Sequence, residues 1–123
     1  MKKILIVEDD EIMINLLAKK LRDHGYIVSL AKDGQVGLSL LKEKENPDLI
    51  LMDLVMPKIH GYSVMEEIQK DEELAKIPLI VISNSGQPVE LDKIKELGAI
   101  DWLVKTEFNP QELLEKIIKQ LGE

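Results

Sequence analysis

Short apolar runs alternate with longer amphipathic stretches five times along this chain of 123 residues. The runs are rich in Ile, Leu and Val and end at charged or turn-forming residues, which is typical of buried strands in a parallel sheet. They occupy residues 4–7, 26–30, 49–52, 79–82 and 100–104. Strands that alternate with helical stretches of this length indicate βαβ units with right-handed crossovers. The pattern therefore predicts an α/β protein with a (βα)5 arrangement around a five-stranded parallel sheet.

The stretches between the strands repeat apolar residues at helical spacing. Gly25 and Gly98 follow the first and fourth of these stretches, where a left-handed residue commonly ends a helix. The turn Asp33-Gly34 opens the second stretch. The helix-spaced apolar residues are Met13, Leu16, Leu17 and Leu21; Val36, Leu40 and Leu41; Val64, Met65 and Ile68; Val89, Ile94 and Leu97; and Leu113, Leu114, Ile117, Ile118 and Leu121. Because no repeat or low-complexity tract interrupts the pattern, we expect one domain over residues 1–123.

Composition narrows the classes of function. The net charge is −7, and the Lys and Arg residues are scattered singly or in pairs, which is unlike the basic stripe of a nucleic-acid-binding protein. There is no cysteine, which excludes disulfides, thiolate metal sites and thiol nucleophiles. The apolar run after Lys2-Lys3 is too short for a signal peptide, and no run has membrane-spanning length. We expect a cytoplasmic protein without direct nucleic-acid or membrane contacts.

Three acidic side chains stand directly after two of the predicted strands. Glu8 and Asp9 follow the first strand, and Asp53 follows the third. In open parallel sheets the ligand crevice lies beyond the carboxyl ends of the strands, so we expect the three carboxylates to gather at one edge. Carboxylates at such range repel one another and raise one another's pKa unless a cation lies among them. Oxygen ligands of this kind suit Mg²⁺, which usually keeps several waters and takes one or two carboxylates.

Two more polar side chains follow the remaining strands at the same edge. Ser83 comes after the fourth strand and Lys105 after the fifth. A carboxylate nucleophile, a metal site and donors for phosphoryl oxygens are the groups that phosphoryl transfer needs. Taken alone, a strand-end serine is common and Lys105 would be an ordinary surface lysine. Their position beside the acidic residues is what indicates a function.

The acidic residues also have ordinary structural explanations. Asp53 could cap a turn, but an Asp between a wholly apolar strand and the dipeptide Met56-Pro57 rarely does so. Glu8 and Asp9 could simply place negative charge at the N-terminus of the first helix, where it is stabilising. We assign that role to Asp10, and we favour a chemical role for the other three carboxylates.

Four segments, in this order and at these spacings, resemble the receiver domain of bacterial two-component response regulators, in particular the single-domain chemotaxis regulators. The matching segments are Ile4-Leu5-Ile6-Val7-Glu8-Asp9-Asp10, Asp53-Leu54-Val55-Met56-Pro57 running to Gly61, Ile82-Ser83, and Gly98-Ala99 through Lys105. The resemblance covers essentially the whole chain. It implies a doubly wound, flavodoxin-like fold with strand order 2-1-3-4-5. It also implies a phosphorelay switch that catalyses its own phosphorylation and dephosphorylation but turns over no external substrate.

The resemblance assigns a role to each acidic residue of the candidate site. Asp53 matches the phosphoacceptor, which takes a phosphoryl group from a histidine kinase or a histidine phosphotransfer protein. Glu8 and Asp9 match the acidic pair that binds Mg²⁺ together with Asp53. The backbone carbonyl of Val55 occupies the family's remaining protein ligand position.

The resemblance also implies how the signal leaves the site. Ser83 matches the hydroxyl that hydrogen-bonds the phosphoryl group, and Lys105 matches the ammonium that pairs with it. Ser83 and Trp102 match the two switch residues, although Trp102 could instead be a packed edge-strand aromatic. The downstream protein target would bind the face made by the fourth helix, the fifth strand and the fifth helix.

The sequence departs from the family pattern after the lysine and after the hydroxyl. The family usually has proline with a cis peptide bond after the lysine, and Thr106 stands there in this chain. A cis bond without proline costs about 3 kcal/mol, so a trans loop and a strained cis loop are both open. Asn84 and Ser85 replace the commoner small residues after Ser83.

Other functions fit parts of the pattern less well. Aspartyl-phosphate phosphatases on a related fold resemble one another in a second Asp two residues after the nucleophile, and Val55 stands at that position here. A flavodoxin-like nucleotide binder needs a Gly-rich or hydroxyl-rich loop after the first strand, where Glu8, Asp9 and Asp10 would repel phosphate. A receiver that works without phosphorylation would lack part of the site, whereas this chain has every residue of it. We therefore favour the phosphorylation switch.

Overall fold

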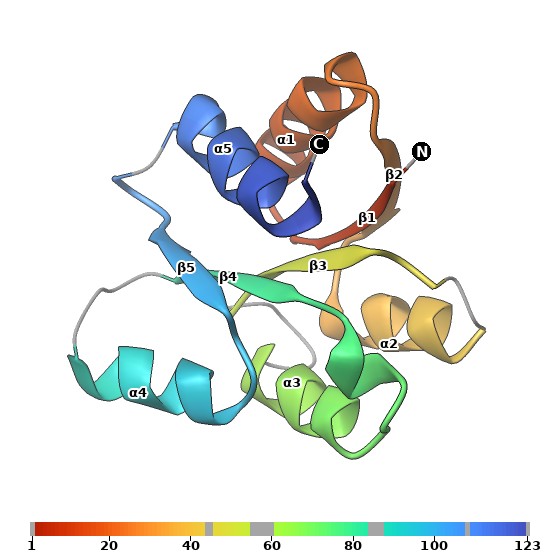
Figure 1. The fold of residues 1–123 in the computed structure, drawn as a ribbon, viewed down its shortest axis with the longest axis vertical. Coiled ribbons are helices and arrows are strands. Elements are labelled where there is room, and N and C mark those ends of the chain that lie inside the picture. The colour runs from red at the N-terminus through yellow and green to blue at the C-terminus, as the bar shows by residue number, and fades with distance from the viewer. Residues whose placement is uncertain (1, 44–45, 55–60, 84–87, 108, 123) are drawn as a thin grey trace.

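Five parallel strands form one sheet in the computed structural model, which describes residues 2–43, 46–54, 61–83, 88–107 and 109–122 (Figure 1). The strands are β1 (Lys3–Val7), β2 (Ile27–Ala31), β3 (Leu49–Asp53), β4 (Leu79–Ser83) and β5 (Asp101–Val104). The helices are α1 (Glu11–Asp23), α2 (Gly34–Lys42), α3 (Gly61–Gln69), the 3₁₀ helix η1 (Leu74–Lys76), α4 (Pro88–Glu96) and α5 (Pro110–Leu121). The strand order is β2-β1-β3-β4-β5. Both the α/β class and the predicted order are confirmed.

Helices cover both faces of the sheet. In Figure 1, α1 and α5 lie on one face, and α2, α3 and α4 lie on the other. Successive side chains of a strand point to opposite faces. Ile4 and Ile6 of β1 therefore enter the core beneath α1 and α5, whereas Leu5 and Val7 enter the core shared with α2 and α3. Burial on both faces explains why the strands read as continuous apolar runs.

Local signals set most of the element boundaries. Asp10 is the N-cap of α1, and its Oδ1 accepts hydrogen bonds from the backbone N–H groups of Ile12 and Met13 at 3.0 and 3.1 Å. The helix-terminal role predicted for Asp10 is confirmed. Gly25 and Gly98 both have positive φ, at +103° and +99°, as expected of residues that follow helix ends.

Some boundaries differ from the prediction because the backbone bonds elsewhere. The N–H of Tyr26 donates to the carbonyl oxygen of Leu21 at 3.1 Å and so closes the end of α1, which delays the start of β2 by one residue. The 3₁₀ helix η1 was not predicted. Its entry depends on the side chain of Asp71, whose Oδ1 accepts from the N–H groups of Glu73 and Leu74 at 2.9 and 3.2 Å.

Candidate functional site

The three predicted carboxylates meet at the carboxyl edge of the sheet. The strand order places β1 beside both β2 and β3, so the chain reverses its winding direction at the boundary between β1 and β3. Ligands of open α/β sheets bind at such a switch point. Carboxylate oxygens of Glu8, Asp9 and Asp53 lie within 4.8 Å of one another there. Glu8 and Asp53 are buried, whereas Asp9 is exposed.

Backbone hydrogen bonds hold the residues of this cluster in place. The register of β1 and β3 pairs Val7 with Met52, which puts Glu8, directly after β1, beside Asp53, the last residue of β3. The N–H of Glu8 donates to the carbonyl oxygen of Ala31 on β2 at 3.0 Å. The N–H of Leu54 donates to the carbonyl oxygen of Ile82 on β4 at 3.2 Å. The ladder therefore continues past the strand ends and fixes both acidic segments.

Lys105 reaches the cluster from the end of β5. Its Nζ lies 3.1 Å from Oδ2 of Asp53 and 3.2 Å from Oε1 of Glu8. No peptide bond between described residues is cis, so the bond from Lys105 to Thr106 is trans. The turn after Lys105 is closed by a hydrogen bond from the N–H of Glu107 to the carbonyl oxygen of Val104, at 2.9 Å. The ammonium thus reaches both buried carboxylates without the proline that is usual in the family.

With both buried carboxylates ionised, the cluster would carry more negative charge than Lys105 offsets. The pKa of Glu8 is raised from 4.5 to about 8, chiefly by burial and then by a hydrogen bond to Asp53 and the charge of Asp53, against the opposing effect of Lys105. Burial alone would lower the pKa of Lys105, but the hydrogen bond and charge of Asp53, together with Glu8, raise it above its usual value. Lys105 therefore stays charged, while ionisation of Glu8 is unfavourable.

Glu8 also has a carboxylate oxygen with an incomplete set of partners. Its Oε2 accepts a hydrogen bond from the N–H of Asp9 at 3.1 Å. Among the described residues, its buried Oε1 accepts no hydrogen bond of good geometry, although the ion pair with Lys105 is 3.2 Å long. A cation placed among the three carboxylates would both satisfy this oxygen and favour the ionised form of Glu8. The donor set, three carboxylates without nitrogen or sulfur, fits a hard divalent ion.

Two of the predicted site residues lie partly or wholly outside the described residues. Ser83 ends β4 and pairs with Val104 of β5, so its backbone lies between the strands that carry Asp53 and Lys105. Its side chain is outside the described part of the chain, as are Val55, Asn84 and Ser85. The structure therefore does not test the hydroxyl assigned to Ser83 or the carbonyl assigned to Val55.

Trp102 lies on β5, at the edge of the sheet, as expected. Its half-buried ring packs against the core shared with α2, α3 and α4. The ammonium of Lys95 on α4 lies 5.2 Å from the ring centroid, within the range of a cation–π contact. Trp102 thus links β5 to α4, away from the three carboxylates.

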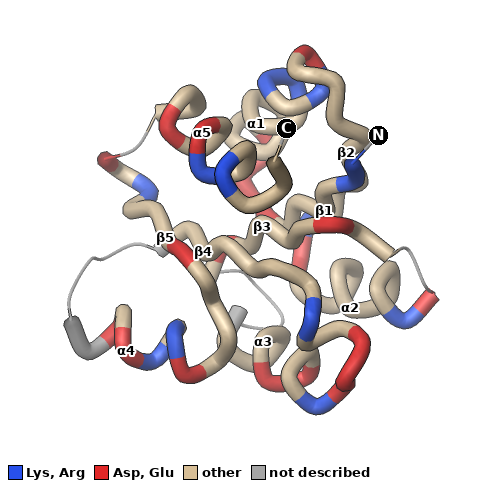
Figure 2. The backbone as a smooth tube through the Cα atoms, viewed as in Figure 1, with Lys and Arg blue, Asp and Glu red and all other residues tan. Residues whose placement is uncertain are grey.

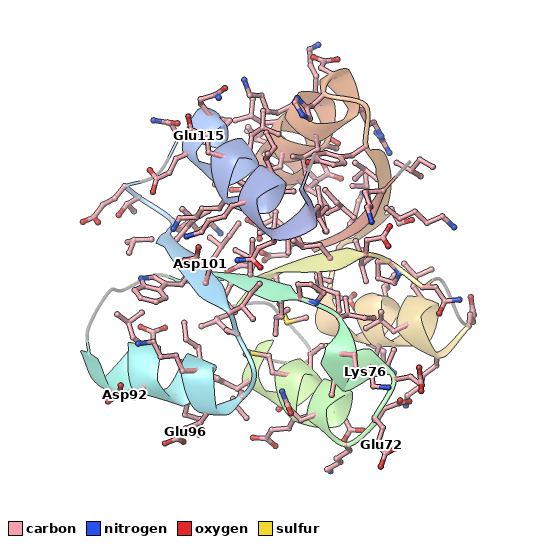
Figure 3. All side chains as sticks on the ribbon, in the orientation of Figure 1. Glu72, Lys76, Asp92, Glu96, Asp101 and Glu115 are labelled. Carbon is pink, nitrogen blue, oxygen red and sulfur yellow. The ribbon has the colours of Figure 1, made fainter. Side chains whose placement is uncertain are left out.

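Sequence reasoning missed an ion pair on the same edge strand. Nζ of Lys116 on α5 lies 3.0 and 3.1 Å from the two carboxylate oxygens of Asp101, the residue before Trp102. Figure 3 labels Asp101 on β5. Oδ1 of Asp101 also accepts a hydrogen bond from the N–H of Trp102 at 2.8 Å. The pair therefore ties α5 to the strand that carries Trp102. Asp101 and Lys116 are 15 residues apart, and no local sequence motif predicts that they pair.

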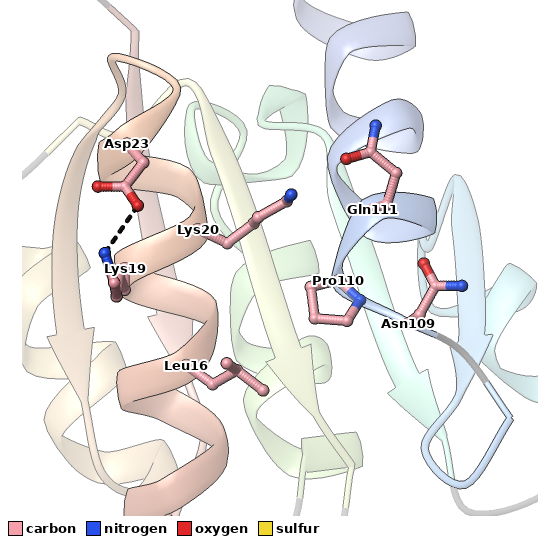
Figure 4. A pocket seen from close by; sticks show the side chains of 7 residues that line it. All are labelled: Leu16, Lys19, Lys20, Asp23, Asn109, Pro110 and Gln111. Atoms are coloured by element: carbon pink, nitrogen blue, oxygen red, sulfur yellow. Dashed lines mark hydrogen bonds and ion pairs between the residues drawn. The ribbon is translucent and has the colours of Figure 1, made fainter.

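A groove of about 450 Å³ lies apart from this chemistry, between α1 and the start of α5 (Figure 4). Its lining residues are Leu16, Lys19, Lys20, Asp23, Asn109, Pro110 and Gln111. Lys19 and Asp23 form an ion pair of 2.9 Å on its rim. No residue of the acidic cluster lines the groove, so the groove is separate from the candidate metal site.

Charged residues of both signs are spread over the described part of the chain. Lys and Arg positions are dispersed over several helices and strands among the described residues and alternate with acidic ones (Figure 2). No helix in the described ranges combines the length and the apolar character needed to cross a bilayer.

Comparison with known proteins places this geometry in a family. The profile of the response regulator receiver domain matches residues 4–118. The "Probable transcriptional regulator ycf27" of Guillardia theta is 38% identical over 116 residues, a match covering 94% of this chain and 44% of that protein. Protein PilH of Pseudomonas aeruginosa is 38% identical over 107 residues, covering 85% of this chain and 86% of PilH. The chain thus spans less than half of the ycf27 relative but most of PilH.

Solved structures agree with this placement. The chemotaxis response regulator CheY4 of Vibrio cholerae is similar with a TM-score of 0.89 at 29% identity, covering 98% of both chains. The receiver domain of sensor histidine kinase PA1611 from Pseudomonas aeruginosa, with a magnesium ion coordinated in its active-site cleft, has a TM-score of 0.82 at 29% identity, covering 99% of this chain and 98% of that one. With the family profile reaching all five strands and an acidic cluster at the switch point of their sheet, the chain belongs to the receiver domains of two-component response regulators.

Proposed function

We propose that this chain is a phosphorylation-activated switch in which Asp53 accepts a phosphoryl group from a histidine kinase or a histidine phosphotransfer protein. The observation that carries the proposal is the contact of one ammonium, that of Lys105, with two buried carboxylates, at 3.1 Å to Asp53 and 3.2 Å to Glu8. Such an arrangement combines a nucleophile with a donor for phosphoryl oxygens in a partly closed site. Receiver domains act as signalling switches rather than as enzymes that turn over a separate substrate.

The proposed reaction is a transfer between nitrogen and oxygen. A carboxylate oxygen of Asp53 attacks the phosphorus of a phosphohistidine and forms a new P–O bond. The bond between phosphorus and the histidine nitrogen breaks, and its electron pair stays on the imidazole. Lys105 already lies beside Asp53, so its ammonium can pair with an oxygen of the transferred group without a large rearrangement. Attack of water on the phosphorus later restores the Asp53 carboxylate and releases phosphate.

We further propose that Glu8, Asp9 and Asp53 hold Mg²⁺, with the carbonyl of Val55 as an additional ligand. The incomplete bonding of Oε1 of Glu8 and the raised pKa of this residue support a cation in the cluster. When bound, Mg²⁺ supplies positive charge that offsets the charge on the phosphoryl oxygens. Asp9 is the exposed member of the group and can take part in binding from the open side.

The signal would leave the site through the face made by α4, β5 and α5. The phosphoryl group carries roughly −1.5 to −2 charge units at neutral pH, in place of the single charge of the Asp53 carboxylate. We propose that the hydroxyl of Ser83 hydrogen-bonds the new group and that Trp102 changes its packing in response. The downstream partner would then bind this altered face. We propose that residues 1–123 form one receiver domain, which acts in the cytoplasm without contacting nucleic acid or membrane directly.

Mass spectrometry after incubation with a small phosphodonor and Mg²⁺ tests the central assignment. We expect the protein to gain one phosphoryl group and the Asp53→Asn variant to gain none, because the amide is nearly isosteric but is not a nucleophile. Asp23→Asn is the matched control, since Asp23 is exposed at the end of α1 and should leave labelling unchanged. Labelling that persists in a folded Asp53→Asn variant would show that another residue is the phosphoacceptor.

A further inference from the structure

Helix α4 is held to the rest of the protein by few apolar contacts. Ile94 is the only side chain of α4 within the described residues that is completely buried, and Leu91 is only partly so. The other described side chains of the helix are charged. Three of them nevertheless contact neighbouring elements: Glu90, Lys93 and Lys95. Polar contacts are therefore an unusually large part of what positions this helix.

The C-terminal end of α4 is anchored to α3. Nε2 of Gln69 donates a hydrogen bond to the carbonyl oxygen of Leu97 at 2.9 Å. Gly98 has a φ of +99°, and a Cβ at this position would collide with Nε2 of Gln69. The N–H of Ala99 donates to the carbonyl oxygen of Ile94 at 2.9 Å and completes the end of the helix. This end is thus fixed by backbone groups and by a close approach.

The N-terminal half of α4 is held to α3 by a different group, which we call the Tyr62 clasp: Tyr62, Glu90 and Lys93. The hydroxyl of Tyr62 donates to Oε1 of Glu90 at 3.4 Å, and the ammonium of Lys93 lies 5.5 Å from the centroid of the Tyr62 ring. Burial raises the pKa of Tyr62, and Glu90 raises it further, so the hydroxyl stays protonated and able to donate. The hydrogen bond is long and hence weak, which suits a contact that opens.

The clasp joins α3 and α4, the two helices that follow β3 and β4. Tyr62 lies in the first turn of α3, which follows β3 and Asp53 through residues 55–60. Glu90 lies in the first turn of α4, which follows β4 and Ser83 through residues 84–87. A displacement of either connection relative to the other therefore moves one half of the clasp against its partner. The anchored C-terminal end gives α4 a fixed point about which its first turns can shift.

We propose that Tyr62 is a positioning residue: the clasp holds the N-terminal half of α4 in the unphosphorylated protein and opens when Asp53 is phosphorylated. The second half of this statement rests on the proposed function, whereas the first half does not. A contact present in only one of two states shifts their equilibrium by its own free energy. Removal of the clasp should therefore make the activated arrangement easier to reach.

Hydrogen exchange of the unphosphorylated protein tests whether Tyr62 holds α4. Tyr62→Phe keeps the ring and its packing and removes only the hydroxyl. We expect amides of α4 to exchange about two- to threefold faster in this variant, while amides of α1 and the amide of Ala99 keep their rates. Unchanged exchange in α4 would overturn the proposal, and so would an equal increase in α1, because it would indicate a general loss of stability.

Titration with beryllofluoride and Mg²⁺, in which amide chemical shifts report binding, tests whether the clasp opens on activation. Tyr62→Phe and Glu90→Ala should each lower the half-saturating concentration by about two- to threefold, and the double variant should go no further. Glu90→Gln retains an acceptor oxygen and should restore the wild-type value. Glu67→Gln, on α3 but outside the clasp, is the matched control.

The outcomes distinguish a failure of the clasp to open from a failure of the proposed function. An unchanged or raised half-saturating concentration in Tyr62→Phe and Glu90→Ala would overturn the opening of the clasp. A wild-type protein that fails to bind beryllofluoride would overturn the proposed function instead. In that case the hydrogen-exchange result alone decides whether Tyr62 positions α4.

Discussion

Helices α1 and α4 lie on opposite faces of the same sheet and are held there by different forces. Helix α1 buries four side chains almost completely, namely Ile14, Leu17, Ala18 and Leu21. Helix α4 has one such side chain among its described residues, Ile94, together with the partly buried Leu91, and its other described contacts come from charged residues. Apolar burial is strong and non-directional, whereas single exposed polar contacts contribute little each. The two helices should therefore differ in how readily they move.

This difference matches their positions relative to the acidic cluster. Helix α1 begins at Glu11, and its N-cap, Asp10, directly follows Asp9 and fixes the chain at the edge of the site. Helix α4 begins beyond β4 and contacts Trp102 on the edge strand. A switch needs a rigid part that holds its reactive groups and a part whose position can change at small free-energy cost. We infer that the α1 side supplies the first and α4 the second.

Truncation of matched leucines gives the largest expected contrast. Leu17→Ala should lower the free energy of unfolding by about 3 kcal/mol, because it leaves a cavity beneath α1. Leu91→Ala should cost about 1 kcal/mol, since that side chain on α4 is only partly buried. Urea unfolding of both variants measures the difference, with Leu16→Ala, whose side chain is 50% exposed, as the surface control. Equal losses from Leu17→Ala and Leu91→Ala would contradict the contrast between the helices.

The pH dependence of the free energy of unfolding tests how strongly the fold disfavours ionisation of Glu8, on the α1 side of the molecule. Because the pKa of Glu8 is about 8 in the fold and 4.5 as its ordinary value, the folded protein keeps a proton that the unfolded chain loses between these values. The resulting stability is fully present below about pH 4.5 and is lost as the pH rises through about 8. Glu8→Gln lacks this loss, so its stability relative to wild type should rise by roughly 3 kcal/mol between about pH 5 and about pH 8.

Urea unfolding in a chelating buffer at about pH 5 and about pH 8 measures this effect. Glu66→Gln, at an exposed position of α3, serves as the control and should follow the wild type. Addition of Mg²⁺ should reduce the advantage of Glu8→Gln at the higher pH, because a bound cation stabilises the ionised carboxylate. A constant difference between Glu8→Gln and wild type at both pH values would mean that Glu8 is ionised in the fold.

The smallest expected effect concerns the contact between α4 and the edge strand. Lys95→Gln removes the cation over Trp102 and should cost only about 0.5–1 kcal/mol. The emission of Trp102, the only tryptophan of the chain, should shift, and its quenching by acrylamide should increase. Lys19→Gln, which breaks an exposed ion pair on α1, should leave both readings unchanged. If Lys95→Gln leaves both readings unchanged too, α4 does not hold the ring in place.

Features that depend on neighbouring residues were predictable from the sequence. The five strands are visible in the sequence as apolar runs because both faces of the sheet are covered. The helix ends were predictable from Asp10, Gly25 and Gly98 because caps use local hydrogen bonds and a left-handed residue. The meeting of Glu8 and Asp53 also followed, since the carboxyl ends of parallel strands share one edge. The roles of Ser83 and Val55 stay predictions.

Features that depend on how the crossovers pack were decided only by the tertiary structure. Tyr62 and Glu90 are 28 residues apart, and nothing near either one in the sequence points to the other. The trans bond after Lys105 and its simultaneous contact with two carboxylates depend on where β5 ends relative to β1 and β3. The high pKa of Glu8 requires burial, which is a property of the assembled sheet and helices. Periodicity and capping act within a few residues of the chain, whereas burial and contacts between helices exist only once the chain has folded.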